Sequence, residues 1–336
     1  MSKVTLSAIA KAAGVGVATV DRVLNRRAPV REATRQNVLR AATALGYRDE
    51  QTRLLRGETP QKRARMGFIL LSPSYSFWQP FTDAIARSAQ PWLPAGESPL
   101  FHWHDIDATA QVAASLRALA QQVDVIGLVA LDHPLIRHAV EEVSQQGVRV
   151  FTLFSDLSPC GHTGYIGLDN QKAGRTAGWM AANLVREQGS IGILVGDHRF
   201  NCQESCEISF RSCLREQAAG LRVLEPLKTH ETIAGGYAAT RELLHMSADL
   251  RLIYAPCGGI EGVLTALREV PERQITLVCH GPVAQGELAL IDGTMTVMLR
   301  HPLQALADTV INTLMKSETG FQQVTVPFEI VTRENI

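Results

Sequence analysis

From Met66 to the C-terminus, short apolar segments alternate with amphipathic segments of helical period. Alternation of this kind builds parallel sheets whose right-handed crossovers place helices on both faces. The predicted strands are too many for one sheet, so we predict an α/β body of two doubly wound lobes. Ligands of such lobes bind at the carboxyl ends of the strands. The predicted strands are 67–71, 100–103, 125–130, 148–153, 165–168, 191–195, 222–227, 252–254, 275–279, 295–299 and 326–331, and the helices include 135–146, 171–187, 237–246 and 303–316.

The start of the chain is basic and the remainder is acidic, although 33 basic and 33 acidic residues give a formal net charge of zero. Residues 1–65 hold 14 Lys and Arg against 5 Asp and Glu, a net charge of +9, which leaves −9 on residues 66–336. Such an asymmetry indicates that the chain contacts a polyanion at one end. Hydrophobic residues make up 46% of the chain, which is typical of a folded globular protein and not of a disordered one.

Three short helices are predicted in the basic segment. Thr5 is the expected N-cap of the first, and Gly14-Val15-Gly16 supplies a tight turn into a second helix at residues 17–24. A third helix runs from about residue 31 to 45 and stops at Gly46. This pattern is typical of an all-α helix-turn-helix headpiece, here residues 1–47, followed by a polar linker at residues 48–65.

The second helix presents side chains that suit the major groove of DNA. Its leading residues Val17, Ala18 and Thr19 are small, so the backbone can approach base edges. The forked guanidinium of Arg22 can read guanine. Neighbouring polar side chains suit phosphate oxygens, which fix register without reading sequence. The pattern disfavours the alternative of a solvated basic bundle that binds nothing.

Short motifs run densely through residues 4–57. They are Val4-Thr5-Leu6, Ile9-Ala10, Ala13-Gly14-Val15, Thr19-Val20, Arg22-Val23-Leu24-Asn25, Val30, Thr34-Arg35, Leu45-Gly46-Tyr47 and Leu55-Arg56-Gly57. They closely resemble the headpiece and hinge of the LacI/GalR family of bacterial repressors. The resemblance implies that Leu55 wedges into the minor groove when a hinge helix folds on DNA, the alternative being a flexible tether. The predicted DNA contacts are Thr5, Leu6, Val17, Ala18, Thr19, Arg22, Asn25, Thr34, Tyr47 and Leu55.

Segments that follow the predicted strands carry a second resemblance. They include Ser74–Trp78, Leu131–Pro134, Gly167–Asn170, His198-Arg199, Cys202–Ser205, Cys257–Gly259, His280-Gly281 and Arg300–Pro302. Their order resembles the periplasmic sugar-binding-protein fold that this repressor family uses as its effector domain. The resemblance implies an effector-binding and dimerisation domain at 66–336, with lobe 1 at about 66–165 and 297–322 and lobe 2 at about 166–296 and 323–336. The predicted effector contacts are Tyr75, Phe77, Trp78, Asp132, Arg199, Glu204, His280 and Arg300.

Departures from the usual pattern of that fold bear on the ligand. Cys257 and Gly258 stand where Asn or Asp is usual, and His280 stands where Asp is usual. Carboxylates hold sugar hydroxyls through paired acceptors, whereas a histidine with Arg199 and Arg300 suits an acidic or phosphorylated ligand. We therefore predict a sugar, sugar acid or sugar phosphate as effector, and favour the acidic forms.

Other classes of site are disfavoured. The chain contains no dinucleotide fingerprint, P-loop or Gly-x-Ser-x-Gly elbow, so we predict no cofactor and no enzymatic activity. His198, Cys202 and Cys206 spread over about 12 Å of one helix, too far to share a metal ion, so no metal site is predicted. Neither a signal peptide nor the run of about 20 apolar residues that spans a membrane is found, and sparse cysteines indicate a reducing cytoplasm.

The sequence therefore predicts a cytoplasmic, nucleoid-associated transcriptional regulator, most simply a repressor. It would bind a pseudo-palindromic double-stranded DNA operator as a homodimer, under the control of a small molecule in the interlobe cleft, and would not contact a membrane. The alternative is a non-catalytic small-molecule-binding module, or a sugar-active enzyme, with a basic tethering head. A tether needs neither the glycine turn nor the small leading residues of the second helix, so the pattern favours the regulator.

Overall fold

The computed structural model describes residues 5–25, 30–45, 64–94, 96–316 and 318–336. The chain divides into two compact units, Met1–Arg63 and Ala64–Ile336, and each is described by itself. Nearly all of the predicted linker lies outside the described residues, so the hinge prediction stays a prediction. Within the described ranges, no helix is long and apolar enough to cross a membrane.

The headpiece is a bundle of α1 (Leu6–Ala13), α2 (Val17–Asn25) and α3 (Glu32–Ala44). Thr5 caps α1 as predicted, since its Oγ1 accepts a hydrogen bond from the Ala8 N–H at 3.3 Å. Gly14 follows α1 in the left-handed conformation, with φ of +64°, which turns the chain sharply toward α2. The three-helix prediction is confirmed by a shared apolar core of Ile9, Ala10, Ala13, Val20, Val23, Leu24, Val38, Leu39 and Ala42.

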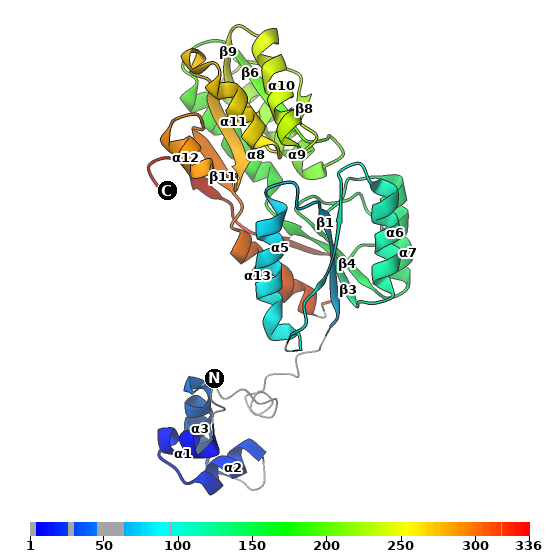
Figure 1. Ribbon diagram of the computed structural model, residues 1–336, viewed down its shortest axis with the longest axis vertical. Helices are drawn as coiled ribbons and strands as arrows, with labels where there is room; N and C mark the ends of the chain where they lie inside the picture. The colour runs from blue at the N-terminus through cyan, green and yellow to red at the C-terminus, as the bar shows by residue number, and fades with distance from the viewer. Residues whose placement is uncertain (1–4, 26–29, 46–63, 95, 317) are drawn as a thin grey trace. The chain divides into compact units, whose positions relative to one another are not determined.

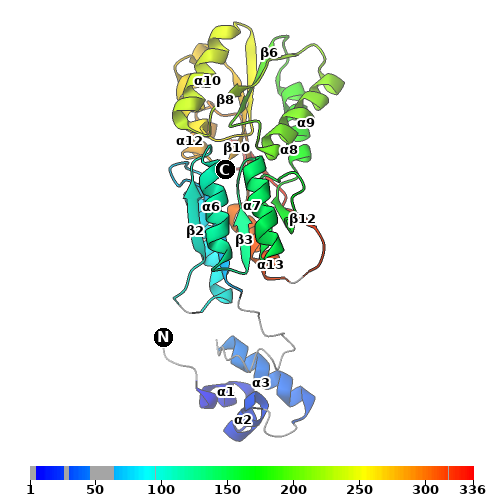
Figure 2. The same cartoon turned by 90° about the vertical axis from the view of Figure 1, so that its right-hand side faces the viewer.

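Lobe 1 of the body is a six-stranded parallel sheet with helices on both faces. Its elements are β1 (Met66–Leu71), α5 (Trp78–Ala89), η1 (Gln90–Trp92), β2 (Leu100–His104), α6 (Thr109–Ala120), β3 (Val125–Leu128), α7 (Pro134–Gln145), β4 (Arg149–Leu153), β5 (Gly164–Gly167), α13 (Leu303–Met315) and β12 (Gln322–Thr325). The strand order is β12–β5–β4–β3–β1–β2. Figures 1 and 2 show α6 and α7 on one face and α5 and α13 on the other. Both faces are thus covered, so β1 and β3 are buried along their whole length.

Lobe 2 repeats this architecture. Its elements are α8 (Asn170–Leu184), β6 (Ser190–Val195), α9 (Asn201–Gln217), β7 (Arg222–Val223), β8 (Leu227–Lys228), α10 (Ile233–Met246), β9 (Leu250–Ala255), α11 (Ile260–Arg268), η2 (Pro271–Arg273), β10 (Thr276–Gly281), α12 (Gly286–Ile291), β11 (Val297–Arg300) and β13 (Glu329–Val331). The order is β13–β11–β10–β9–β6–β7, with β8 also paired to β6 and only β13 antiparallel to its neighbour. Figure 2 shows α8 and α9 on one face of the sheet and α10 on the other. The two-lobed doubly wound prediction is confirmed.

The predicted lobe boundaries near the C-terminus are wrong. The prediction places residues 297–322 in lobe 1, but β11 pairs with β10 and therefore belongs to lobe 2. Conversely, β12 pairs with β5 in lobe 1, although 323–336 is predicted for lobe 2. The chain therefore crosses between the lobes after β5, β11 and β12. Strand β12 reads Gln-Gln-Val-Thr and lacks an apolar run, which is why the pattern missed it.

Close packing of α8 against α9 depends on glycine. A Cβ added at Gly174 would collide with the carbonyl oxygen of Cys206. We therefore expect Gly174→Ala to lower the free energy of unfolding by about 1–3 kcal/mol, because the helices must separate. Urea denaturation of the full chain measures the loss. Gly220→Ala is the matched control, since no atom lies within 4 Å of an added Cβ there, and equal losses in both variants would contradict the close-packing argument.

Candidate functional site

A cavity of about 360 Å³ lies between the two lobes of the body, with walls from both. Lobe 1 contributes the loops after β1, β3 and β4, and lobe 2 contributes the loops after β6, β8, β9, β10 and β11. Each of these loops leaves the carboxyl end of a strand. This is where the sequence places the ligand site of doubly wound lobes.

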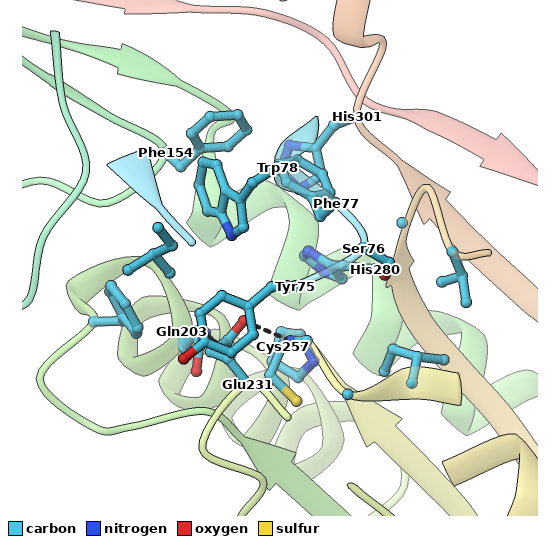
Figure 3. Close-up of a pocket in the computed structure, with 18 of the residues that line it drawn as sticks. Tyr75, Ser76, Phe77, Trp78, Phe154, Gln203, Glu231, Cys257, His280 and His301 are labelled. Atoms are coloured by element: carbon cyan, nitrogen blue, oxygen red, sulfur yellow. Dashed lines mark hydrogen bonds between the residues drawn. The ribbon is translucent and has the colours of Figure 1, made fainter. Parts of the chain in front are cut away.

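Aromatic rings form one wall of the cavity. Figure 3 shows Phe77, Trp78 and Phe154 gathered on one side, and their ring centroids lie 5.0–5.2 Å apart in edge-to-face contacts. Phe154 adopts a left-handed backbone conformation, with φ of +63°. Phe154 directly follows β4, and its ring meets those of Phe77, in the β1–α5 loop, and Trp78, the first residue of α5. The wall suits the apolar face of a ring-shaped ligand.

Glu231 brings a carboxylate to the opposite side of the cavity, where Figure 3 shows it beside Gln203 and Cys257. Its Oε1 accepts a hydrogen bond from Gln203 Nε2 at 2.8 Å, and its Oε2 accepts one from the Gly258 N–H at 2.9 Å. Burial raises the pKa of this carboxyl group, while the two hydrogen bonds oppose the rise. A Cβ at Gly196 or Gly258 would collide with the carboxylate, so both glycines make room for it. Glu231 is thus a fixed acceptor inside the cavity.

Two histidines from lobe 2 strand ends complete the lining. His280 Nε2 lies 3.1 Å from the Tyr254 hydroxyl, and the His280 and His301 rings lie 6.0 Å apart. Burial lowers the pKa of His280 to about 4. Burial and the neighbouring His280 lower the pKa of His301 to about 3. Both rings are therefore neutral at pH 7 and can exchange hydrogen bonds with hydroxyl groups.

These histidines should make the fold sensitive to acid. The unfolded chain protonates a histidine below about pH 6.5, whereas the folded chain does so only near pH 4 at His280. The unfolded state then binds more protons, so stability falls as pH drops from about 6.5 toward 4. We expect the His280→Gln/His301→Gln variant to show a flatter acid limb in urea unfolding measured across this range. His138→Gln, at an exposed site, should keep the wild-type dependence of stability on pH. If the double variant also kept it, His280 and His301 would not be the source of the acid sensitivity.

Direct bonds also join the lobes around the cavity. Ser76 Oγ donates to Glu261 Oε1 at 2.5 Å, and Arg199 Nη2 lies 3.0 Å from Asp107 Oδ1. Asn201, at the start of α9, donates from Nδ2 to the Asp156 carbonyl at 3.0 Å. Each bond pairs a group of lobe 1 with a group of lobe 2, so a change in lobe closure must alter all three.

The structure brings four of the predicted effector residues together and leaves four outside. Tyr75, Phe77, Trp78 and His280 line the cavity, whereas Asp132, Arg199, Glu204 and Arg300 do not. The predicted contacts omit Gln203, Glu231 and His301, although Gln203 and His301 lie in the segments Cys202–Ser205 and Arg300–Pro302 that the sequence analysis places around the ligand. A polar Thr-His-Glu-Thr run that begins two residues after the predicted strand 222–227 was the available signal for Glu231.

The residues outside the cavity have other partners. Arg199 pairs with Asp197 at 2.9 Å, and Arg300 pairs with Glu329 at 2.7 Å. Asp132 pairs with Arg137 and accepts a hydrogen bond from Ser158. Glu204 is exposed on α9. None of the described lining residues is Lys or Arg, so the expected basic site for an acidic ligand is not formed here, because both arginines pair with local carboxylates.

In the headpiece, the predicted base-reading residues are accessible. Val17 is 46% exposed, and Ala18 and Arg22 are also exposed, while Thr19 and Thr34 are half-buried. Thr5 caps α1, and Leu6 packs against the headpiece core. Asn25 ends α2, but Tyr47 and Leu55 lie outside the described residues.

Within the described part of the chain, no group of three or more His, Cys, Asp or Glu residues is arranged to hold a metal ion. The cysteines considered for such a site have other surroundings. Cys202 lines the cavity, and the Cys206 thiol donates to the Asn170 carbonyl at 3.4 Å.

A helix-turn-helix headpiece joined to a two-lobed ligand-binding body defines a class of bacterial transcription regulators. Residues 66–320 match the family model of the periplasmic binding protein domain, and residues 5–50 match that of bacterial regulatory proteins of the lacI family. Over its body the chain therefore belongs to the periplasmic binding protein domain family, and its headpiece is a helix-turn-helix domain of the lacI family of bacterial regulatory proteins.

Individual relatives are distant. The HTH-type transcriptional regulator GalS of Salmonella typhimurium is 24% identical over 331 residues, which covers 96% of this chain and 92% of GalS. An ABC transporter solute binding protein from Agrobacterium vitis with bound D-fucose superposes with a TM-score of 0.74 at 17% identity, over 81% of this chain and 96% of that one. A second, from Burkholderia graminis with D-arabinose, gives a TM-score of 0.73 at 17% identity, over 82% and 97%. These two structures support the fold of the body.

Proposed function

We propose that this chain is a ligand-responsive transcriptional repressor that acts in the cytoplasm, at the nucleoid, and binds a pseudo-palindromic operator as a dimer. The observation that carries the proposal is the presence, on one chain, of a helix-turn-helix with an exposed α2 and a body with an interlobe cavity. Ligand in the cavity would favour one arrangement of the lobes and so change operator affinity. By linkage, operator must then change ligand affinity by the same factor.

The DNA contacts we propose are those of the sequence analysis. Val17, Ala18 and Arg22 would read bases, because they are exposed on the helix that follows the Gly14 turn. The cap residue Thr5 and the half-buried threonines would contact phosphates, together with Leu6, Asn25 and Tyr47. Leu55 would wedge into the minor groove.

We propose a neutral sugar or polyol as the effector, in place of the acidic ligand that the sequence favours. The charged side chains of the lining are the carboxylates Glu231 and Glu261, and these would repel a phosphate or a sugar acid. Fixed carboxylate oxygens and neutral histidines can hold hydroxyl groups, while the aromatic wall can cover an apolar ring face. The sugar ligands of the two similar binding proteins agree with this class.

Selection of DNA by the full-length protein from a random library tests the regulatory role. We expect enrichment of a two-fold symmetric site, a gel shift that resists competing random DNA, and a dimer in sedimentation analysis. Affinity should fall steeply with salt, because a headpiece neutralises several phosphates. Binding without sequence preference would instead support a tethering head.

A panel of neutral sugars and polyols, sugar acids and sugar phosphates tests the effector class. We expect thermal-shift and calorimetric binding by a neutral compound, and a change in the affinity for the selected operator when it is added. Tight binding of a sugar acid or phosphate, with no response to any neutral compound, would overturn the proposed class.

A further inference from the structure

The loop between β4 and β5 holds a cysteine, a histidine and an aspartate in hydrogen-bonded contact. Cys160 Sγ lies 3.4 Å from His162 Nδ1, and His162 Nε2 lies 3.0 Å from Asp156 Oδ1. The imidazole is therefore held at both nitrogens, with the thiol on one side and the carboxylate on the other. None of the three lines the interlobe cavity, so the proposed function does not use this cluster.

Asp156 is fixed as an anion by its other partners. The Thr152 hydroxyl donates to Oδ1 at 2.6 Å, and the Leu157 N–H donates to the same oxygen at 2.9 Å. Burial alone would lower the pKa of His162, but the hydrogen bonds with Asp156 and Cys160 outweigh it and raise this pKa to about 9. The ring is then an imidazolium at neutral pH. Its Nδ1–H group faces the Cys160 sulfur. The reactive form of cysteine is the thiolate, which a neighbouring imidazolium stabilises.

Four of the other five cysteines are buried, and Cys202 is half-buried like Cys160. Burial raises the pKa of each of these thiols, to about 12 at Cys202 and upward also at Cys206, Cys213, Cys257 and Cys279. A buried, protonated thiol is inert toward oxidants. Cys160 is only half-buried, between the exposed residues Pro159 and Gly161. Cys160 thus combines partial exposure to solvent with a cationic neighbour, His162, and none of the other five cysteines does so.

We propose that Cys160 is a redox-sensitive thiol that small hydroperoxides oxidise to a sulfenic acid, with His162 and Asp156 as its positioning residues. The thiolate sulfur attacks one oxygen of hydrogen peroxide, a sulfur–oxygen bond forms, and the oxygen–oxygen bond breaks. Sulfur is oxidised by two electrons and the peroxide is reduced. The leaving hydroxide takes the proton from His162 Nδ1 and departs as water, which leaves a neutral imidazole beside the sulfenic acid.

The location links this chemistry to the interlobe contacts. Asp156 accepts the hydrogen bond from Asn201 of lobe 2, and Ser155 Oγ accepts one from the Cys202 N–H at 3.3 Å. The preceding residue, Phe154, belongs to the aromatic wall of the cavity. Loss of the imidazolium charge would weaken the His162–Asp156 pair on the loop that carries these contacts.

The test treats the full-length protein with limiting hydrogen peroxide, traps sulfenic acid with dimedone, and maps the six cysteines by mass spectrometry. At pH 6.5 we expect Cys160 to be labelled at least about tenfold faster than any other cysteine, and about tenfold more slowly in His162→Gln. Asp156→Asn should also slow the labelling of Cys160. His138→Gln, an exposed histidine of the same lobe, should leave the rate unchanged, and Cys160→Ser should remove the label.

The pH profile separates chemistry from a change of structure. At about pH 10 a free thiol is ionised without help, so wild type and His162→Gln should converge to within about twofold there. A variant that merely loosens the loop would instead label faster than wild type at pH 10, which would overturn the positioning role. Labelling of Cys160 at pH 6.5 no faster than in the urea-unfolded chain would overturn the proposal itself.

Discussion

Glu231→Ala is expected to weaken binding of the neutral effector by about 2–3 kcal/mol, or 30- to 150-fold in Kd. The carboxylate offers the ligand fixed acceptor oxygens, because Gln203 and the Gly258 N–H hold one oxygen each. Truncation removes those acceptors and also leaves both donors without a partner in a buried site. Isothermal titration with the tightest-binding compound of the neutral panel measures the loss.

Two further variants sharpen this prediction. Glu231→Gln keeps the shape, but its amide must direct an N–H toward either Gln203 Nε2 or the Gly258 N–H, both donors, so it should also bind weakly. Glu204→Ala is the matched control, because Glu204 is exposed on the helix that carries Gln203 and lies outside the cavity. An unchanged Kd in Glu231→Ala, or an equal loss in Glu204→Ala, would remove Glu231 from the effector site.

Periodicity predicts most of this fold because the buried strands are continuous apolar runs. The segments 67–71 and 191–195 differ from β1 and β6 by one residue at most, since both are covered on each face. Periodicity does not reveal a strand that is partly exposed or short. Strand β12 is polar at three of four positions, and the predicted strand 222–227 is two short strands, β7 and β8. Because β12 was missed, residues 323–325 were placed in lobe 2 and not in lobe 1.

The residues that line the cavity could be predicted only where a recognisable motif directly follows a predicted strand. Tyr75, Phe77 and Trp78 follow β1 directly, so their place at the carboxyl edge of the sheet follows from topology. Arg199 and Arg300 also follow strand ends, but Arg199 pairs with Asp197 and Asp107, and Arg300 pairs with Glu329. Asp107 and Glu329 are distant in sequence, and periodicity gives no sign of such pairs. The acidic ligand favoured by the sequence depended on these arginines being unpaired in the site.

Arg22→Ala is expected to weaken binding to the selected operator by about 1–3 kcal/mol per half-site, or about 5- to 150-fold, and to relax specificity at one base step. Arg22 lies on the exposed face of α2, and its guanidinium can donate two parallel hydrogen bonds to guanine. Because a dimer would place this side chain in both half-sites, symmetric operators should lose more affinity than operators in which only one half-site matches. Quantitative gel shifts on single-base variants of the operator measure both effects.

Arg40→Ala is the matched control, because Arg40 is exposed on α3 and lies outside the helix proposed to enter the major groove. If it contacts DNA at all, it should contact phosphate, so its loss should weaken all sequences equally and reduce the salt slope by about one. Arg22→Ala should instead change the order of preference among operator variants. A uniform loss in Arg22→Ala, with no change in that order, would make Arg22 a phosphate contact and transfer base reading to the leading residues Val17 and Ala18.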